Sequence, residues 1–505
     1  MELRPHQFPP ITPGHGGVDV DPSWGPAALR DPISQYFQCA FDVRRHFKVV
    51  APLSAARGYF GFGPGIVCYG RTGVGYHSRR ADHSLYDASK DLSSEEFTVR
   101  LPFDPTEVIT NLTHERYVRG FATANSDLGE RLVRHLYYVV RPFLPLGVRS
   151  QMQKFYLRNW RDLPFPAWPV DPTVDVLMKT LLRLGMKAAG VQKIPFIWFW
   201  PDGASACSIM SHDVETEAGK QLCSTIMDMD DEFKIPASFQ IVPEERYGVS
   251  RDFIDGIKAR GFEVNVQDLN HDGRLFWRYD KFKEKAEKIN QYGRELGAVG
   301  FRSAILYRNQ EWYDLLDFEY DMSVPNVAHL DPQRGGCCTV MPYFIGDMLE
   351  LPVTTTQDHS LFHILNDYSM DLWRHQIDLI LKQNGLISFI IHPDYIVGAR
   401  AQAAYRSLLS ELNQLRSERN VWIAHPREVN RWWRQRSEMR LVSNNGQLAI
   451  EGEGNQRARV AFASVEGDEI VYSLPAHMRC IPDPCGSQSH PPSPPGPTSS
   501  DAINR

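Results

Sequence analysis

From Ile194 onward, apolar segments typical of strands alternate with amphipathic segments typical of helices, and this alternation is the strongest constraint on the fold. Strand signals lie at 194–210, 237–242, 263–266, 300–303, 386–391 and 421–424, and helix signals at 250–259, 281–296, 368–382 and 401–419. Strands that are joined by helices run parallel in one sheet. The pattern therefore predicts an α/β domain over residues 194–430, a distorted (β/α) barrel of about seven units whose closure could be incomplete.

The rest of the chain differs from this region in composition. With 505 residues the chain is too long for one ordinary core. Residues 1–193 predict a mixed, mostly helical N-terminal region, with helix signals from Pro105 to about Pro142 and over 173–189. Residues 431–475 contain short strand signals separated by turns, which predict a small antiparallel β appendage. Residues 476–505 are rich in Pro, Ser and Gly and are expected to be a disordered tail.

Composition excludes several functional classes. The net charge is -6 and no basic stripe is present, so no nucleic-acid partner is expected. No apolar run is long enough for a membrane span, and the first residues lack the apolar core of a signal peptide, so we expect a cytoplasmic protein. The 8 cysteines form no Cys-x-x-Cys pair, which argues against a structural zinc site. The sequence does not indicate an oligomeric state.

The stretch Ser211-His212-Asp213-Val214-Glu215 ends the first apolar segment of the predicted barrel. Because Asp213 and Glu215 are two residues apart, their side chains point to the same side of a strand. The carboxyl ends of parallel strands are where catalytic groups and ligands gather. One carboxylate could hold a metal while the other acts as a base. The alternative is that both acids only cap the helix that follows.

Three more polar residues follow apolar segments further along the chain. His271 comes shortly after the strand at 263–266, Arg302 lies in the strand at 300–303, and His392 directly follows the strand at 386–391. Since these strands are predicted to be parallel neighbours, the three side chains should lie at the same edge of the sheet as Asp213. An acid, a base and an arginine at one edge predict a catalytic site, although buried structural partners are the simpler explanation of each residue alone.

This order of residues resembles the polysaccharide deacetylase family, carbohydrate esterase family four, also called the nodulation-type deacetylase homology domain. The resemblance spans about 195–427 and is to the branch whose first motif reads Asp-x-Asp or Asp-x-Glu. It implies that Asp213 is the catalytic base, that Arg302 holds this base, and that His392 is the acid. It also implies that backbone N–H groups just after Arg302 face the oxyanion.

The same resemblance implies a divalent metal, most often zinc, held by Glu215, His271 and the residue at position 267. The family motif there is His-x-x-x-His, and in this chain Gln267 replaces the first histidine. An amide oxygen is a weaker metal ligand than imidazole, so the departure predicts lower affinity. The fourth family motif has no clear counterpart. Its nearby candidates are Trp312, Asp314 and Asp321.

The sequence leaves three functions open. The first is a metal-dependent hydrolase that removes N-acetyl groups from a sugar or polysaccharide precursor. The second is a metal-free amide hydrolase of the same fold, and the third is a non-catalytic carbohydrate-binding or scaffold protein with a degenerate cleft. Retention of Asp213, Arg302 and His392 together favours catalysis, because a binding module needs neither base nor acid. A separate His-x-x-x-His, His359 to His363, has zinc-pair spacing but lacks the acid that zinc proteases place between the histidines.

Overall fold

The structure, a computed structural model, describes residues 32–475 except 74, 76–77, 82–83, 96, 121–150, 153–154, 156 and 445–446. The predicted tail at 476–505 and the second half of the predicted helix ending near Pro142 lie outside this range. Among the described helices, none combines the length and the apolar character that crossing a membrane requires.

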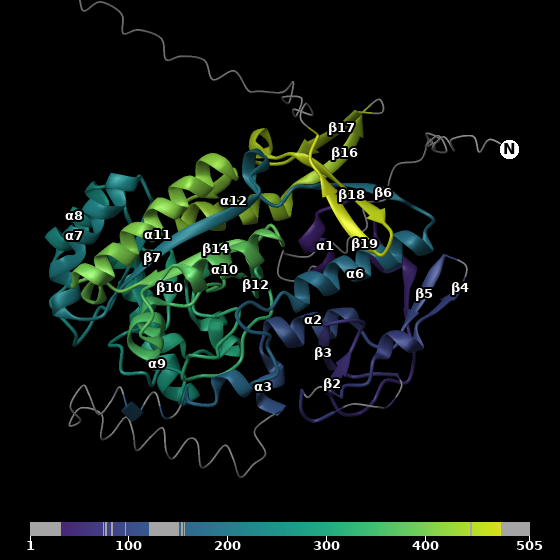
Figure 1. Cartoon of the computed structure of the whole chain (residues 1–505), viewed down its shortest axis with the longest axis horizontal. Coiled ribbons are helices and arrows are strands. Elements are labelled where there is room, and N and C mark those ends of the chain that lie inside the picture. Colours follow the sequence, from purple (N-terminus) through teal and green to yellow (C-terminus); the bar gives the residue numbers. More distant parts are fainter. Residues whose placement is uncertain are drawn as a thin grey trace, which may run out of the picture.

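The centre of the molecule is a 9-stranded sheet in the order β12-β13-β11-β10-β9-β8-β7-β14, with β15 also paired to β7. The strands are β7 (Ala206–Val214), β8 (Ala237–Ile241), β9 (Glu263–Gln267), β10 (Gly300–Arg302), β11 (Tyr320–Asp321), β12 (Tyr343–Ile345), β13 (Met348–Glu350), β14 (Leu386–Ile391) and β15 (Val421–Ile423). Every pairing is parallel except β12 with β13. The curled sheet in Figure 1 confirms the predicted α/β class and barrel.

The barrel is not closed by a strand ladder in the described part of the chain. Instead, the segment after β13 contacts β14 mostly through side chains: Thr354 Oγ1 donates to Leu386 O at 2.7 Å and accepts from Ser388 N at 2.9 Å, beside one backbone bond from Thr355 N to Ser388 O at 3.3 Å. Thr355 adds a bond from its own Oγ1 to Ser388 O at 2.7 Å. The expected incomplete closure therefore takes the form of a seam of threonine hydroxyls.

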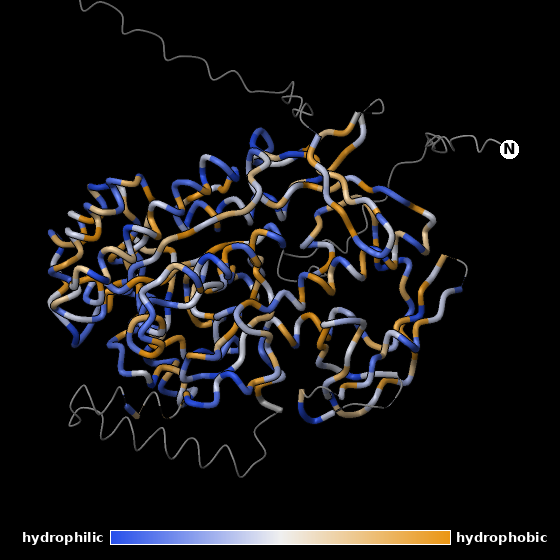
Figure 2. Tube along the Cα trace, viewed as in Figure 1, coloured by the Kyte–Doolittle hydropathy of each residue, from blue (hydrophilic) through white to orange (hydrophobic). Residues whose placement is uncertain are grey.

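Helices cover the outer side of the sheet, because each carries one apolar face. They are α7 (Glu217–Phe233), α8 (Arg251–Ala259), α9 (Tyr279–Leu296), α10 (Asp371–Leu381), α11 (Ala399–Glu418) and, after β15, α12 (Pro426–Glu438). Ile226, Ile254 and Leu408 from three of them lie in one buried apolar cluster with residues of β7 and β8. Apolar and hydrophilic positions alternate along these helices in Figure 2, as a half-buried helix requires.

The long apolar run that opens the barrel region forms two strands instead of one. β6 (Lys193–Ile197) ends before a turn at Pro201–Gly203, in which Asp202 has a positive φ of 56°, and β7 begins after that turn. β6 leaves the barrel and pairs with β18 (Val460–Glu466), which pairs with β19 (Glu469–Ser473). The remaining C-terminal strands, β16 (Arg440–Asn444) and β17 (Gln447–Glu451), form an antiparallel hairpin.

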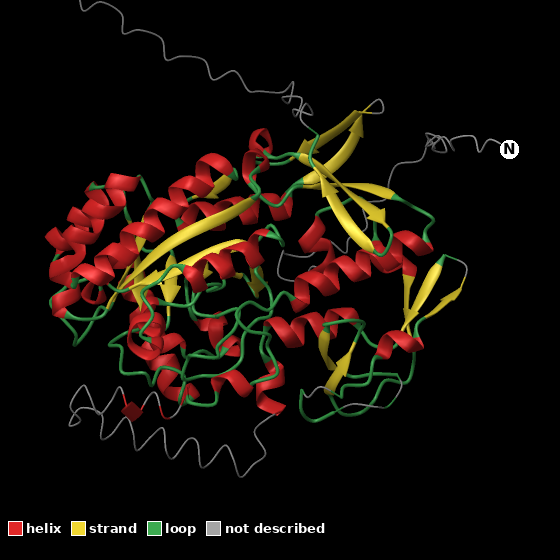
Figure 3. Cartoon of the chain, viewed as in Figure 1, coloured by secondary structure: helices red, strands yellow, loops and turns green. Residues whose placement is uncertain are grey.

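In the described part of residues 32–193, short strands and helices occur together beside the barrel (Figure 3). The elements are α1 (Pro32–Phe37), β1 (Phe47–Val49), β2 (Gly58–Gly61), β3 (Val67–Gly70), β4 (Ser93–Glu95), β5 (Thr98–Leu101), α2 (Pro105–Thr113), α3 (Arg116–Gly120) and α6 (Thr173–Ala188). Buried polar bonds join this region to the barrel: Arg308 Nε donates to Glu115 Oε2 at 2.6 Å, and Thr339 Oγ1 donates to Asp175 Oδ1 at 2.8 Å.

Candidate active site

The carboxylates of Asp213 and Glu215 lie at the C-terminal end of β7. Asp213 is the penultimate residue of this strand, and Glu215 follows its last residue. Both side chains point to the same side of the sheet, as their spacing predicts, and both contact Gln267. Because successive side chains of a strand point to opposite faces, His212 lies on the other face of the sheet. There its Nε2 lies 2.9 Å from Asp230 Oδ2 on α7. His212 therefore belongs to the packing between sheet and helix, while Asp213 and Glu215 belong to the cleft.

Arg302, the last residue of β10, holds Asp213. Its Nη1 lies 3.2 Å from Asp213 Oδ1 and 3.3 Å from Oδ2, and its Nη2 donates to Ser211 Oγ at 3.0 Å. Arg302 is fully buried and Asp213 is only 4% exposed. Burial raises the pKa of Asp213 and the charge of Arg302 opposes that rise, so the carboxyl ends above its ordinary range. The pair therefore provides a carboxylate that is oriented and more basic than an exposed one.

The backbone N–H group of Ser303, just after Arg302, was expected to face the oxyanion but already has a partner. Ser303 N donates to Ser323 Oγ at 2.7 Å, so this N–H group is already used inside the fold. Of the candidates for the fourth motif, Asp321 lies nearest this network. It sits on β11 and accepts from Ser323 Oγ at 2.6 Å. Trp312 instead packs against Phe282 of α9.

Asp321 also pairs in register with Glu350 of β13. Burial, and then the charge of Asp321, raise the pKa of Glu350 well above its ordinary range, although Arg302 acts in the opposite direction. A neutral Glu350 leaves the charge of Arg302 to compensate that of Asp213.

Glu215 is surrounded by nitrogen atoms. Its Oε1 lies 2.7 Å from His271 Nε2, 3.0 Å from Gln267 Nε2 and 3.5 Å from His392 Nε2. Burial alone would raise the pKa of Glu215, but the two histidines outweigh it, His271 most strongly, and hold the pKa well below its ordinary range. Glu215 is therefore a stable anion at the centre of the site.

Gln267, the last residue of β9, connects the two carboxylates. Its Nε2 donates to Glu215 Oε1 and also to Asp213 Oδ2, at 3.2 Å. Its Oε1 is buried and has no hydrogen-bond partner among the described residues. The amide thus reduces the repulsion between two neighbouring carboxylates, which is a role that a cation would otherwise fill.

A turn after β9 places His271 in the cleft. Asp268 and His271 both have positive φ, 52° and 54°, which is uncommon for residues other than glycine. The Asp268 carboxylate stabilises the turn by accepting from Leu269 N at 2.6 Å. His271 is 4% exposed, and neither of its ring nitrogens has an aligned hydrogen-bond partner among the described residues. Its Nε2 nevertheless lies 2.7 Å from Glu215 Oε1, so an imidazole and a carboxylate lie in direct contact here.

His392 is held by an aspartate that the sequence did not reveal. Asp358 Oδ1 lies 2.7 Å from His392 Nδ1, and Asp358 Oδ2 accepts from His392 N at 2.7 Å. Asp358 is fully buried at the start of a π-helix, His359–Leu365. The pairing leaves the Nε2 of His392 facing Glu215. Burial lowers the pKa of His392, but the carboxylates of Asp358 and Glu215 together outweigh it and the pKa ends well above its ordinary value of 6.5, which favours the protonated ring at neutral pH.

The second histidine pair, His359 and His363, lies on this π-helix. Their ring centroids are 5.6 Å apart, and the ring of Tyr395 lies 4.6 Å from His363 and 4.7 Å from His392. Among the His, Cys, Asp and Glu side chains of the described chain, the one group of three whose ligand atoms all lie within 4.8 Å of one another is Asp213, Glu215 and His392. The second pair has no third ligand there, and burial lowers the pKa of His359 to about 4.

The donor set at Glu215 fits a divalent cation. The set offers a carboxylate oxygen and an imidazole nitrogen, and rotating the Gln267 amide by half a turn would bring its unbonded oxygen to the position of the nitrogen. These are oxygen and nitrogen ligands of the kinds that zinc accepts, with a neutral amide where a second imidazole would bind more strongly. The sequence-predicted residues Asp213, Glu215, Gln267, His271, Arg302 and His392 therefore all lie at one buried edge of the sheet.

Comparison with known proteins gave matches among solved structures only. No protein-family profile and no curated protein matches the chain. A polysaccharide deacetylase structure from Mycobacterium smegmatis is 20% identical over 47% of this chain and 93% of that chain, with a TM-score of 0.39. One from Pseudomonas aeruginosa PAO1 is 13% identical over 46% and 92%, with a TM-score of 0.36. PuuE allantoinase is 14% identical over 46% and 92%, also with a TM-score of 0.36.

Proposed function

We propose that this protein is a metal-dependent hydrolase that removes N-acetyl groups from a sugar or polysaccharide precursor. One observation carries the proposal. Asp213, a carboxylate held by Arg302, and His392, an imidazole held by Asp358, lie with the Glu215 anion in one buried cluster. Hydrolysis of an amide needs a base for water and an acid for the amine, and the motif order described above resembles a family with this chemistry.

Asp213 acts as the base in this proposal. It accepts the proton of the attacking water while the oxygen of that water forms a bond to the acetyl carbon. Arg302 keeps the carboxylate in one orientation, and the raised pKa of Asp213 brings its basicity closer to what proton abstraction near neutral pH needs. Because Ser211 fixes the other end of the guanidinium, the base cannot swing out of the cleft.

His392 acts as the acid. Its Nε2 proton passes to the nitrogen of the sugar as the carbon–nitrogen bond breaks, so that acetate and a free amine leave. Asp358 supports this step in two ways: it stabilises the imidazolium beforehand, and it fixes the ring through Nδ1 so that Nε2 points into the cleft.

Glu215, His271 and Gln267 would hold the divalent ion, which when bound polarises the carbonyl and lowers the pKa of a water molecule. In this arrangement Glu215 and His271 are the strong ligands, and Gln267 supplies a neutral ligand at the cost of the bonds that its Nε2 now donates to Asp213 and Glu215.

A metal-free amide hydrolase of the same fold is the second candidate, and one observation favours it. Gln267 Nε2 donates to both carboxylates and so occupies the place between them without any ion. A purely carbohydrate-binding protein has no comparable support, since neither the Asp213–Arg302 pair nor the Asp358–His392 pair is needed to bind a neutral sugar.

Release of acetate from N-acetylated sugars by the purified protein tests the proposal. We expect activity that disappears after treatment with a chelator and returns with zinc or another divalent ion. Activity that survives exhaustive chelation, with no metal in the protein by elemental analysis, would select the metal-free candidate. No acetate from N-acetyl mono- or oligosaccharides under either condition would contradict the assignment as a deacetylase.

A further inference from the structure

The loop at 303–308, which follows Arg302, contains two residues in an uncommon backbone conformation. Ile305 has a φ of 59° and a ψ of 18°, and Leu306 has a φ of 54°. A positive φ is uncommon for residues other than glycine, and it is strained for a β-branched side chain such as that of Ile305. Such strain persists only where the surrounding structure enforces it, and it occurs mainly at functional sites. The loop therefore depends on contacts that hold it in place.

Arg308 makes the contact that holds Leu306. Its Nη1 donates to Leu306 O at 2.8 Å, so the guanidinium directly fixes a residue with positive φ. Gln333 fixes the backbone of Arg308 on both sides: Arg308 N donates to Gln333 Oε1 at 3.0 Å, and Gln333 Nε2 donates to Arg308 O at 3.1 Å. The conformation of Leu306 thus depends on where the guanidinium of Arg308 is held.

Glu115 of the N-terminal region holds this guanidinium. Arg308 Nε donates to Glu115 Oε2 at 2.6 Å, and Arg308 Nη2 donates to Glu115 Oε1. Glu115 lies between α2 and α3, and its carboxylate also accepts from Gly336 N at 2.7 Å and from Gln310 Nε2 at 3.3 Å. Both members of the pair are buried, so salt and water screen their interaction little. Two parallel bonds between a guanidinium and a carboxylate fix direction as well as distance.

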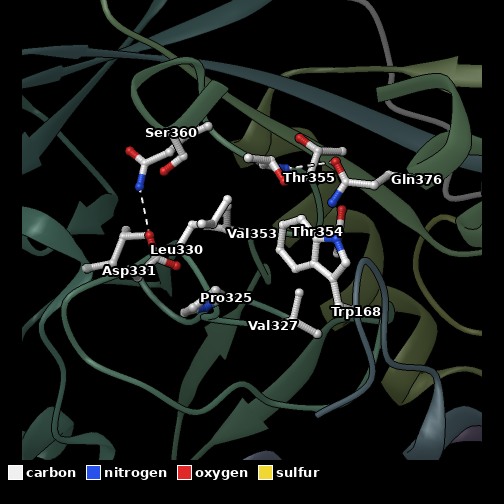
Figure 4. A pocket seen from close by; sticks show the side chains of 13 residues that line it. Trp168, Pro325, Val327, Leu330, Asp331, Val353, Thr354, Thr355, Ser360 and Gln376 are labelled. Atoms are coloured by element: carbon white, nitrogen blue, oxygen red, sulfur yellow. Dashed lines mark hydrogen bonds between the residues drawn. The ribbon is translucent and has the colours of Figure 1, made fainter. Parts of the chain in front are cut away.

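The loop lies between the base side and the acid side of the candidate site. It begins directly after Arg302, and its Leu306 belongs to a small buried apolar cluster with Val353 and Ile390. Ile390 is two residues before His392. In Figure 4, Val353 lies in the wall of a small pocket that Leu306 also lines. A shift of Leu306 would therefore affect both the residue that holds the base and the strand that precedes the acid.

We propose that Glu115 and Arg308 are positioning residues for the hydrolysis, so that the N-terminal region holds the loop at 303–308 in the conformation that the base and the acid require; this inference rests on the proposed function. Neither residue bonds to the base or the acid in the described structure. Both act through Leu306 and its apolar cluster. A displacement of about 1 Å near reacting groups can cost about 10²-fold in rate, so a contact outside the chemistry can control turnover.

Kinetics of two variants with the tetrasaccharide of N-acetylglucosamine test the inference. Arg308→Lys keeps the charge but lacks the planar fork that bonds to Glu115 and Leu306 O together. Its kcat should fall by about 10²-fold with little change in KM, because the loop moves while the substrate still binds. Glu115→Gln keeps the shape, removes the charge and should lower kcat in the same way. Unchanged kcat in both variants of an active, folded protein would overturn the inference.

Glycine at position 305 separates positioning from folding. Ile305→Gly adopts positive φ without strain, so the loop should depend less on the Glu115–Arg308 pair. Arg308→Lys should then lower kcat about tenfold less in the Ile305→Gly background than in the parent. Ile305→Ala is the matched control, because it also shortens the side chain but keeps most of the strain. Equal effects of Arg308→Lys in the parent and in both backgrounds would show that the pair does not act through the loop.

A second contact between the same two regions provides a control for stability. Thr339→Val removes the buried bond from Thr339 Oγ1 to Asp175 Oδ1, which lies outside the loop at 303–308. It should lower the melting temperature and leave kcat unchanged. A fall in kcat as large as that of Arg308→Lys would show that any weakening of the interface reduces turnover, and it would contradict a specific positioning role.

Hydrogen exchange followed by mass spectrometry distinguishes failure of this inference from failure of the proposed function, because it requires no turnover. Arg308→Lys should speed exchange in the peptide that covers 303–310, where Tyr307 N and Arg308 N are hydrogen-bonded, while β7 and β8 stay protected. Faster exchange there, with no acetate released by the parent, would retain the held loop and contradict deacetylation. Unchanged exchange in Arg308→Lys would overturn the inference whatever the activity of the parent.

Discussion

Two buried arginines, one in the candidate active site and one where α12 meets α1 and β6, show how differently the same charge is stabilised. Arg302 and Arg436 are both fully buried. Arg302 faces the carboxylate of Asp213. Arg436, on α12, has no carboxylate at ion-pair distance among the described residues and donates only to backbone carbonyls, those of Gln35, Tyr36, Ile197 and Trp198, at 2.8 to 3.3 Å. Burial without a carboxylate lowers the pKa of Arg436 to about 9.

This difference between a carboxylate partner and carbonyl partners indicates which of the two regions can take part in a reaction. Carbonyl dipoles are fixed, so Arg436 can only tie α12 to β6 and α1, three elements far apart in the sequence. Asp213 can gain and lose a proton, and Arg302 holds it while it does so. Activity should therefore depend on the region around Arg302, and stability on the region around Arg436.

The largest expected effect is on turnover. Asp213→Asn preserves the shape of the side chain but removes its basicity, so hydrolysis should fall by about 10²–10⁴-fold. The melting temperature should change little, because Asn can still accept from Arg302. Acetate release and thermal unfolding measure the two quantities. Near-full turnover of the Asn variant would show that Asp213 is not the base.

Arg436→Met is the opposite test, because it should affect stability and leave the chemistry unchanged. The variant leaves four buried carbonyls without their donor and should lose about 3 kcal/mol of unfolding free energy. Denaturant unfolding measures the loss, and kcat of the folded fraction should be unchanged. Arg431→Met, an exposed position on the same helix, is the matched control. If kcat falls with stability, the two regions are not independent.

The role of His392 can be separated from that of Asp213 by the leaving group. His392→Ala should slow the hydrolysis of substrates with poor amine leaving groups by about 10²-fold and affect good ones much less, since only a poor leaving group needs a proton. A series of N-acetyl compounds with graded amine basicity measures the trend. Equal slowing across the series would indicate a binding role.

The pH dependence of kcat/KM follows from the two shifted groups. On the acid side, activity is lost when Asp213 takes up a proton, and burial moves that loss to higher pH than for an exposed Asp. On the alkaline side, activity is lost when His392 gives up its proton, at a pH well above 6.5. A plateau should therefore span neutral pH. Asp358→Asn removes the charge that raises the pKa of His392, so the alkaline limb should move to lower pH, whereas Arg436→Met should move neither limb.

The smallest expected effect concerns the metal. Gln267→His offers an imidazole in place of a neutral amide and should raise zinc affinity by about tenfold, or about 1.4 kcal/mol. Titration calorimetry of zinc into the metal-free parent and variant measures this directly and does not require activity. Equal or weaker binding in the variant would place Gln267 outside the metal shell and favour its alternative role as a bridge between two carboxylates.

Local patterns in the sequence predicted those residues of the candidate site that lie at the ends of strands. Asp213, Arg302 and His392 each end or follow an apolar strand, and parallel strands bring such ends together, so their meeting could be predicted. Asp358 could not be, because its contact with His392 spans 34 residues and depends on the path of an irregular segment.

The division of the run at 194–210 has a local signal, because Pro201-Asp202-Gly203 between β6 and β7 is a typical turn sequence. The partners of the two strands, β18 for β6 and β8 for β7, could not be predicted. Periodicity reports which face of an element is buried, but it carries no information on which distant element covers that face.

The threonine seam between the segment after β13 and β14 gives the barrel one wall that differs from the others. Separating β7 from β8 breaks a ladder of backbone hydrogen bonds, whereas separating this wall breaks a small number of bonds, mostly made by the hydroxyls of Thr354 and Thr355. Each such bond contributes about 1 kcal/mol. The wall beside His392 is therefore a part of the barrel that can separate at low cost while the strands stay folded.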